Sequence, residues 1–246
     1  MIKSVKKAMD ILTILSSSGE KPITLAKLSE QTGLNKSTCA HIVDTMCESF
    51  YVERVSRKEG YRLGPWSFML SRYGSYRNSL VKIATPVLKW LRNRTGASVF
   101  ISVVCNGRKY IVFHIDKDNI LPMSDGSIIQ GYMETTATGL VLLAYMNSST
   151  FNSSLSHRTL EEREYLTSPE FKARLREIRH NGYSMVDVVS QNTKSYAFPV
   201  FDSENHVIAA LGILYQNEFD SPEYRDQLLK AGRTASSEIS RRMAFE

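Results

Sequence analysis

Residues 23–46 read ITLAKLSEQTGLNKSTCAHIVDTM and decide the fold of the first part of this chain. Thr24 is suited to cap a helix that runs to about Gln31, because its hydroxyl can accept a hydrogen bond from a free backbone N–H. Gly33 can adopt the left-handed conformation that a sharp turn requires. A second helix begins near Asn35, so the stretch predicts a helix-turn-helix.

The second helix of this motif has one apolar side, formed by residues spaced at i, i+3, i+4 and i+7: Cys39, Ile42, Val43 and Met46. The opposite side is then free to enter the major groove of DNA. A merely structural helical hairpin would show the same pattern. Six residues of the motif are candidate DNA contacts: Thr24, Asn35, Lys36, Ser37, Thr38 and His41.

A β-hairpin is predicted directly after this motif, with strands over residues 51–55 and 60–63. Such a wing places its loop beside the second helix, where Arg57 and Lys58 can meet phosphate, and Arg62 is a third candidate. A solvated surface loop is the alternative for this charge cluster. A helix over residues 66–76 is expected to connect the wing to the remainder.

Composition and charge agree with two folded domains, one of them basic. The chain has 246 residues, 42% of them apolar, and a formal net charge of +6. The first 80 residues contain twelve basic and seven acidic residues, whereas the rest contains nineteen and eighteen. The basic excess therefore lies with the predicted helix-turn-helix, which favours a polyanionic partner.

Several classes of protein are disfavoured by missing patterns. The sequence has no secretory apolar run and no membrane-spanning stretch, so we expect a cytoplasmic protein without a membrane partner. Cys39, Cys47 and Cys105 lack metal-ligand spacing and are expected to be reduced thiols, with no metal and no cofactor. Nucleophile elbows, phosphate-binding glycine loops and zinc-protease motifs are absent, which argues against an enzyme.

The second part predicts an antiparallel sheet flanked by helices, so the fold class is α+β. Asn106 and Gly107 indicate a tight hairpin between strands over 99–104 and 110–115. Two further strands are expected over 197–201 and 207–214. Helices are expected after Pro86, over 136–146, from Ser168–Pro169 to Gly182, and from Ser221–Pro222 onward. The last has an apolar stripe that we expect to pack on its own sheet, with packing on a partner subunit as the alternative.

The order and spacing of several short motifs closely resemble the IclR family of bacterial transcriptional regulators. These motifs lie along nearly the whole chain: Gly33–Leu34–x–Lys36–Ser37–Thr38, Tyr61–Arg62–Leu63–Gly64, Ala197–x–Pro199–Val200, Ala209–Ala210 and Glu238–Ile239–Ser240–Arg241–Arg242. The resemblance implies a winged helix-turn-helix domain over residues 1–64, a linker helix over 65–79, and a GAF-like effector-binding and oligomerisation domain over 80–246. It also implies operator DNA, a small-molecule effector, a homodimer or homotetramer, and repression as the expected mode.

The resemblance places the effector, an organic acid or a sugar-derived metabolite, near the start of the buried helix. The implied effector residues are Met133, Glu134, Thr135, Thr136, Ala137, Asp187, Ser195 and Gly212. Glu134 is unfavourable beside a carboxylate, so a neutral or hydroxyl-rich ligand held by Glu134 and Asp187 is a second hypothesis.

This chain also departs from the family at several of the pocket positions. The family's Gly-Lys pair is Gly139–Leu140 here, and the usual glycine before the Ala-x-Pro-Val strand is Asn192. These replacements motivate a third hypothesis, a constitutive DNA-binding protein whose effector domain is only structural. His41 stands where the family commonly has Arg, which predicts a different operator sequence.

Overall fold

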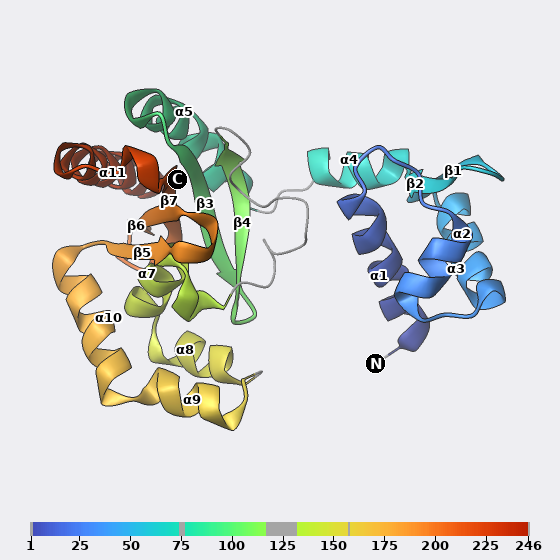
Figure 1. The fold of residues 1–246 in the computed structure, drawn as a ribbon, viewed down its shortest axis with the longest axis horizontal. Helices are drawn as coiled ribbons and strands as arrows, with labels where there is room; N and C mark the ends of the chain where they lie inside the picture. The colour runs from blue at the N-terminus through green and yellow to red at the C-terminus, as the bar shows by residue number, and fades with distance from the viewer. Residues whose placement is uncertain (1, 74–76, 117–131, 157, 246) are drawn as a thin grey trace. The chain divides into compact units, whose positions relative to one another are not determined.

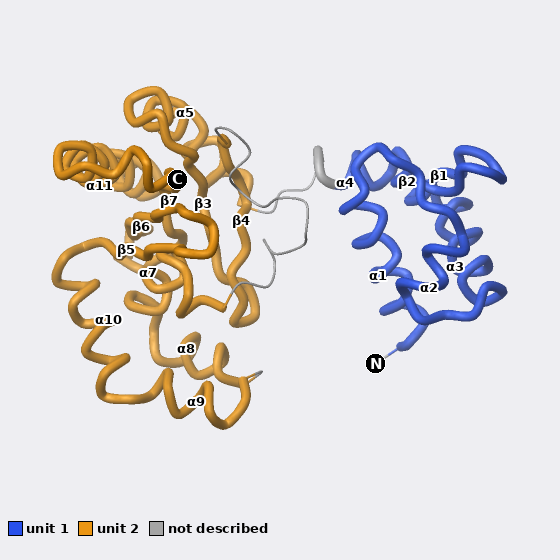
Figure 2. The backbone as a smooth tube through the Cα atoms, viewed as in Figure 1, with its two compact units in different colours: residues 1–76, 124–126 blue, residues 77–123, 127–246 orange. Residues whose placement is uncertain are grey.

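The computed structural model describes residues 2–73, 77–116, 132–156 and 158–245 (Figure 1). The chain divides into two compact units, and we call the described residues 2–73 unit 1 and the described residues from 77 onward unit 2 (Figure 2). Within these residues, no helix combines the length and apolar character needed to cross a bilayer.

Unit 1 opens with three helices: α1 (Lys3–Ser17), α2 (Leu25–Thr32) and α3 (Lys36–Glu48). The turn between α2 and α3 contains Gly33 at a φ of 65°, so the predicted helix-turn-helix is confirmed. The three helices share an apolar core that includes Ile11, Leu15, Leu28, Cys39, Val43 and Met46.

The predicted wing is confirmed as the hairpin of β1 (Val52–Ser56) and β2 (Gly60–Leu63), which α4 (Pro65–Tyr73) follows. Ile23 and Tyr61 exchange two backbone hydrogen bonds of 2.7 and 2.9 Å, which fasten the wing to the segment before α2. Gly60 lies at this junction with a φ of 104°, and a Cβ atom there would meet the Ile23 carbonyl oxygen at 2.2 Å.

Unit 2 is built on a five-stranded antiparallel sheet with the order β4-β3-β7-β6-β5. Its strands are β3 (Ser98–Cys105), β4 (Arg108–Ile115), β5 (Ser184–Val188), β6 (Thr193–Phe201) and β7 (Val207–Gln216). Asn106 and Gly107 both have positive φ and join β3 to β4, as the sequence predicts.

The two faces of this sheet are covered differently. Large side chains of β6 and β7, such as Phe198 and Leu211, point toward α5 (Asn78–Thr95) and α11 (Pro222–Met243). Small ones, such as Ala197 and Ala210, point toward α7 (Ala137–Tyr145), against which α10 (Pro169–Asn181) packs. Helices α7 and α10 and the apolar stripe of α11 are confirmed in their predicted positions.

The sequence interpretation is wrong about where α5 begins. The helix starts at Asn78 and continues through Pro86, which we expected to precede it. Proline in a helix interior removes a backbone hydrogen bond and is normally unfavourable. Here Leu80 and Ala84 before the proline and Leu88 and Leu91 after it are all buried along one side, so packing on the sheet holds a single helix together.

Several short elements of unit 2 are not predicted by the sequence patterns. They are η1 (Met133–Thr135), α8 (Ser148–Leu155), α9 (Leu160–Thr167), η2 (Val189–Gln191) and η3 (Asn217–Phe219), besides strand β5. Most of them are short and polar, so their sequences carry little hydrophobic periodicity.

We expect Gly60→Ala to destabilise unit 1 far more than Gly19→Ala. Both glycines have positive φ, but a Cβ atom at Gly19 would meet nothing within 4 Å. Gly19→Ala should therefore cost about 1 kcal/mol from backbone strain alone. Gly60→Ala should cost at least about 2 kcal/mol more, because the wing must separate from Ile23. Urea unfolding followed by circular dichroism measures both, and equal losses would contradict the close approach.

Candidate functional site

The outer side of α3 is open to solvent within the described structure. Its inner side is buried in the core of unit 1, as the apolar spacing predicts. Four of the predicted DNA-contacting residues are exposed on the helix: Lys36, Ser37, Thr38 and His41. The first half of α3 therefore offers a positive charge, two hydroxyls and an imidazole to a partner.

Thr24 and Asn35 cap the two helices of the motif. The Asn35 Oδ1 atom accepts a hydrogen bond of 2.8 Å from the backbone N–H of Thr38, and the Thr24 hydroxyl accepts one of 3.4 Å from that of Lys27. Both residues lie at the start of their helices. Their side-chain oxygens are engaged in holding the helix ends.

The wing presents positive charge at its tip. Arg57 and Lys58 are exposed there, and neither has an ion-pair partner among the described residues. The carboxylate of the neighbouring Glu59 accepts a hydrogen bond of 2.9 Å from the Ser56 hydroxyl, which holds it against the hairpin. Arg62 differs, because its Nε atom donates to Glu53 across the hairpin at 3.0 Å.

The predicted effector residues 133–137 lie together at η1 and the first turn of α7. Met133 and Ala137 are both buried in the apolar core that α7 forms with its neighbours. The hydroxyl of Thr135 donates to the Tyr132 carbonyl at 2.8 Å. Thr136 caps α7 by accepting from the Gly139 N–H at 3.2 Å.

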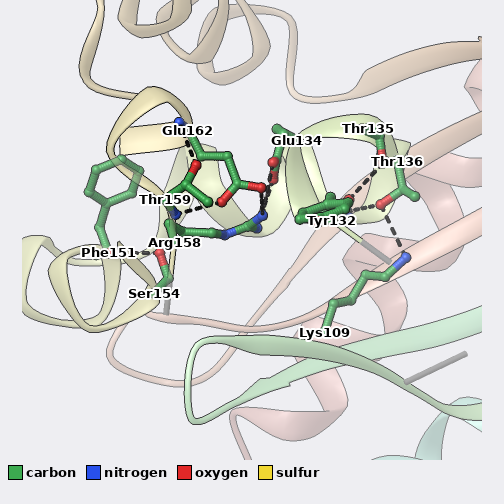
Figure 3. A network of polar contacts seen from close by, with 11 residues as sticks. Lys109, Tyr132, Glu134, Thr135, Thr136, Phe151, Ser154, Arg158, Thr159 and Glu162 are labelled. Atoms are coloured by element: carbon green, nitrogen blue, oxygen red, sulfur yellow. Dashed lines mark hydrogen bonds and ion pairs between the residues drawn. The ribbon is translucent and has the colours of Figure 1, made fainter. Parts of the chain in front are cut away.

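Glu134 is neutralised by an arginine that the sequence interpretation missed. Arg158, just before α9, donates to the two carboxylate oxygens of Glu134 at 3.1 and 2.9 Å (Figure 3). Both side chains are close to nine-tenths buried. The guanidinium also lies over the Tyr132 ring, 4.6 Å from its centroid. Glu134 is thus occupied as a hydrogen-bond acceptor.

A second missed residue, Lys109 on β4, reaches the start of α7. Its ammonium donates to the Thr136 hydroxyl oxygen at 3.1 Å (Figure 3), and the residue is only 7% exposed. Burial lowers the pKa of Lys109 from 10.5 to about 8. No carboxylate pairs with it among the residues that the structure describes. This part of unit 2 therefore holds an unneutralised positive charge.

The hydroxyl of Thr136 is left as a donor. Its oxygen accepts from both Lys109 and the Gly139 N–H, which uses the two lone pairs that a hydroxyl has. The O–H proton must therefore point toward another acceptor. Together with the spare ammonium protons and the free amides of the α7 N-terminus, it makes a set of donors suited to an anion.

Ser195 and Gly212 lie on the sheet face that α7 covers, on neighbouring strands β6 and β7. A Cβ atom at Gly212 would meet the Phe100 ring at 2.3 Å, so this ring occupies the place of a side chain at position 212. Nearby on β3, Ser102 pairs with Ala210, and its buried hydroxyl has no hydrogen-bond partner among the described atoms. Around Ala210 and Gly212, the face is thus built of small side chains and one aromatic ring.

Asp187 is not brought together with the other predicted effector residues. Asp187 lies on β5, directly across from Lys194 on β6, and its carboxylate pairs with the Lys194 ammonium at 3.8 Å. Both side chains are on the sheet face away from Ser195. Lys194 also binds Asp220, which accepts from the Tyr215 hydroxyl at 3.0 Å and from Arg225. Arg225 and these other donors hold the pKa of Asp220 well below its usual range, so the cluster stays ionised.

The cysteines do not form a metal or disulfide site in the described structure. Cys39 is buried, Cys47 and Cys105 are half-buried, and all three are free thiols. Burial raises the pKa of Cys39 and of Cys47, which keeps both protonated and unreactive. Among the described residues, no three His, Cys, Asp or Glu side chains gather as metal ligands.

Comparison with known proteins follows the division into two units. Residues 4–56 match the IclR helix-turn-helix domain, and residues 75–241 match the family described as bacterial transcriptional regulator IclR C-terminal. The chain is 26% identical to the HTH-type transcriptional regulator XynR of Escherichia coli, over 96% of each protein. It is 23% identical to the transcriptional repressor IclR of the same organism, over 86% of this chain and 79% of that one.

A solved structure shows the same fold. An IclR homologue of Microbacterium hydrocarbonoxydans, complexed with 4-hydroxybenzoate, superimposes with a TM-score of 0.78 at 19% identity and covers 99% of this chain and 100% of its own. The C-terminal family match alone spans more than half of the chain, and the helix-turn-helix match precedes it in the expected order. The protein is therefore a DNA-binding transcriptional regulator of the IclR family.

Proposed function

We propose that residues 1–64 read an operator through the outer side of α3 and the tip of the wing. The exposed set of Lys36, Ser37, Thr38 and His41 carries this proposal, because it faces away from the core at the start of a capped helix. Arg57 and Lys58 would contact phosphate, whereas Arg62 would have to leave Glu53 to do so. Thr24 and Asn35 would act through the helix ends they cap.

For residues 80–246 we propose the binding of a small organic anion at the start of α7. The buried ammonium of Lys109 carries this proposal, together with the donor proton of Thr136. A buried, unpaired charge is costly, and a carboxylate beside it would offset part of that cost. The homologue bound to 4-hydroxybenzoate, itself an organic acid, gives independent support to this ligand class.

The positions of the two carboxylates argue against a hydroxyl-rich neutral ligand. That hypothesis needs Glu134 and Asp187 as free acceptors in one cavity. Glu134 is held by both arms of Arg158, and Asp187 pairs with Lys194 on the other face of the sheet. The remaining groups near Thr136 are donors, which select an anion.

The effector would control operator binding by shifting the population between different relative arrangements of the winged helix-turn-helix domains. A single winged helix reads one half-site, so we propose a homodimer or homotetramer, with residues 65–79 joining reader and sensor in each copy. An effector changes operator affinity only by binding one arrangement more tightly than another. We propose repression in the cytoplasm as the mode, in line with the relative named a repressor.

One observation favours the alternative of a constitutive DNA-binding protein. The Phe100 ring fills the place of a side chain at Gly212, on the face where a ligand would lie. A ring in this position reduces the room for an effector. In that alternative, unit 2 would serve only assembly, and no small acid would change its stability.

Operator binding should depend on salt through the wing. Replacing both basic residues of the tip (Arg57→Ala/Lys58→Ala) should reduce the slope of log affinity against log salt by about 0.9 for each phosphate that is no longer neutralised, or about 1.8 in all. The measurement is fluorescence anisotropy on a duplex selected from a random pool, at several salt concentrations. The matched control is Lys172→Ala/Arg174→Ala, which removes two exposed charges from α10. An unchanged slope in the wing variant would contradict the proposed docking.

Lys109→Met should stabilise the ligand-free protein. The native pKa of about 8 lies below the value of 10.5 for an exposed lysine. The desolvation cost is therefore fully present below pH 8, where Lys109 is protonated in both the folded and the unfolded state. Between pH 8 and about 10.5 the cost disappears, because Lys109 loses its proton in the folded state before it does so in the unfolded state. At pH 7 the gain should be about 3.5 kcal/mol, from a pKa difference of about 2.5 at about 1.4 kcal/mol per pKa unit. Urea unfolding at pH 7 and pH 10 measures it; a gain independent of pH would contradict the buried charge.

Organic acids should stabilise the wild-type protein and fail to stabilise Lys109→Met. We expect 4-hydroxybenzoate to raise the melting temperature and the uncharged 4-hydroxybenzamide to leave it unchanged. A ligand at a hundred times its Kd contributes about 2.7 kcal/mol. Arg176→Met on α10 is the matched control and should keep the response. If a panel of small carboxylates leaves the wild type unchanged, the constitutive alternative is favoured; equal shifts in both proteins would exclude Lys109 as the anchor.

A further inference from the structure

An open groove lies between α5 and α11, on the face of unit 2 away from α7. Its volume is about 770 Å³, and its floor is apolar, formed by Val87 and Ala235 with Pro86 and Trp90 at the side. Trp90 is 45% exposed, which is unusual for the largest apolar side chain. Exposed tryptophan in a hollow is a common anchor of protein interfaces.

The groove is positively charged. Arg233, Arg241 and Arg242 line it, and Glu238 is the one acidic residue of its described lining. The Glu238 carboxylate accepts hydrogen bonds of 2.6 to 3.0 Å from both Arg241 and Arg242, so one negative charge faces two positive ones. Helix α5 also carries four basic residues and no acidic one, although none of the four lines the groove itself. An occupant of this groove must therefore be acidic and must offer a large apolar side chain to Trp90.

Helix α9 of the same chain has this chemistry. At about 100° per residue, Leu160, Glu161, Glu164 and Tyr165 fall on one side of the helix. Leu160 is 75% exposed and Tyr165 49%, and neither glutamate has an ion-pair partner among the described residues. The opposite side is engaged within the unit, by the buried Leu166 and by the capping bonds of Glu162.

The nearby basic residue of α9 does not neutralise this acidic side. Arg163 donates to the backbone carbonyls of Arg158 and Ser156, so its guanidinium is drawn back over the turn before the helix. Within unit 2, α9 and the α5–α11 pair lie at opposite ends (Figure 1). The acidic side of α9 therefore cannot reach the groove of its own chain, but it can reach that of a second copy.

We propose that α9 of one copy docks in the α5–α11 groove of another, with Leu160 against Trp90 and with Glu161 and Glu164 beside Arg241 and Arg242. Each copy has one groove and one α9, so two copies related by a two-fold axis can form the contact twice and close the pair. This contact rests on the self-association proposed above and names the surfaces that would carry part of it.

Charge reversal on the full-length chain tests the contact without DNA or effector. Arg241→Glu/Arg242→Glu and Glu161→Lys/Glu164→Lys should each weaken self-association at least tenfold in sedimentation-velocity experiments over a range of concentrations. The variant with all four changes should recover most of the affinity, because the opposite charges then face each other again. Trp90→Ser should weaken association without any change of charge. Arg174→Glu/Arg176→Glu on α10 is the matched control and should have no effect.

The outcomes separate this contact from the wider proposal. If neither double variant weakens self-association, the α9 contact is wrong while self-association stands. The same holds if the variant with all four changes associates no more tightly than either double variant. If the wild type is monomeric at all concentrations, self-association itself fails. Thermal unfolding of each variant shows whether weaker association comes merely from a misfolded chain.

Discussion

The central residues of strands β6 and β7 are sorted by size between the two faces of the sheet, and the functional layout of unit 2 depends on this. Both strands are buried on both faces, so each residue faces either the α5–α11 layer or α7. Large residues such as Phe198 and Leu211 cover the face toward α5 and α11. On the face toward α7, Ala197, Ala210 and Gly212 extend little above the backbone. Helix α7 can therefore approach closely and be apolar nearly all round, which brings its N-terminus and Thr136 within reach of Lys109 on β4.

Local patterns are enough to predict unit 1 and most of the sheet. Gly33, the apolar spacing around Val43 and the pair Asn106–Gly107 each dictate a backbone conformation within a few residues, so a single sequence can reveal them. The start of α5 could not be predicted in this way. Its continuation through Pro86 depends on burial against a sheet formed by distant residues.

The candidate ligand site shows the same limit more sharply. Its predicted residues near Thr136 are placed at the start of a buried helix, because Thr136 and the apolar run after it are contiguous. The charges that decide what the site can bind come from elsewhere. Lys109 is 27 residues away and Arg158 is 24 residues from Glu134, and neither stands in a recognisable motif. Asp187 shows the converse, since strand alternation turns it to the other face.

The low pKa of Lys109 has a consequence for the whole regulator. An anion beside this ammonium would favour its charged form, so capture of the proposed carboxylate near pH 8 would take up a proton from the solvent. Occupancy at a fixed concentration of the proposed effector would then fall as the surrounding solution becomes alkaline. A single buried amine would thus make the cell's acid–base state a second input to gene control, alongside the metabolite.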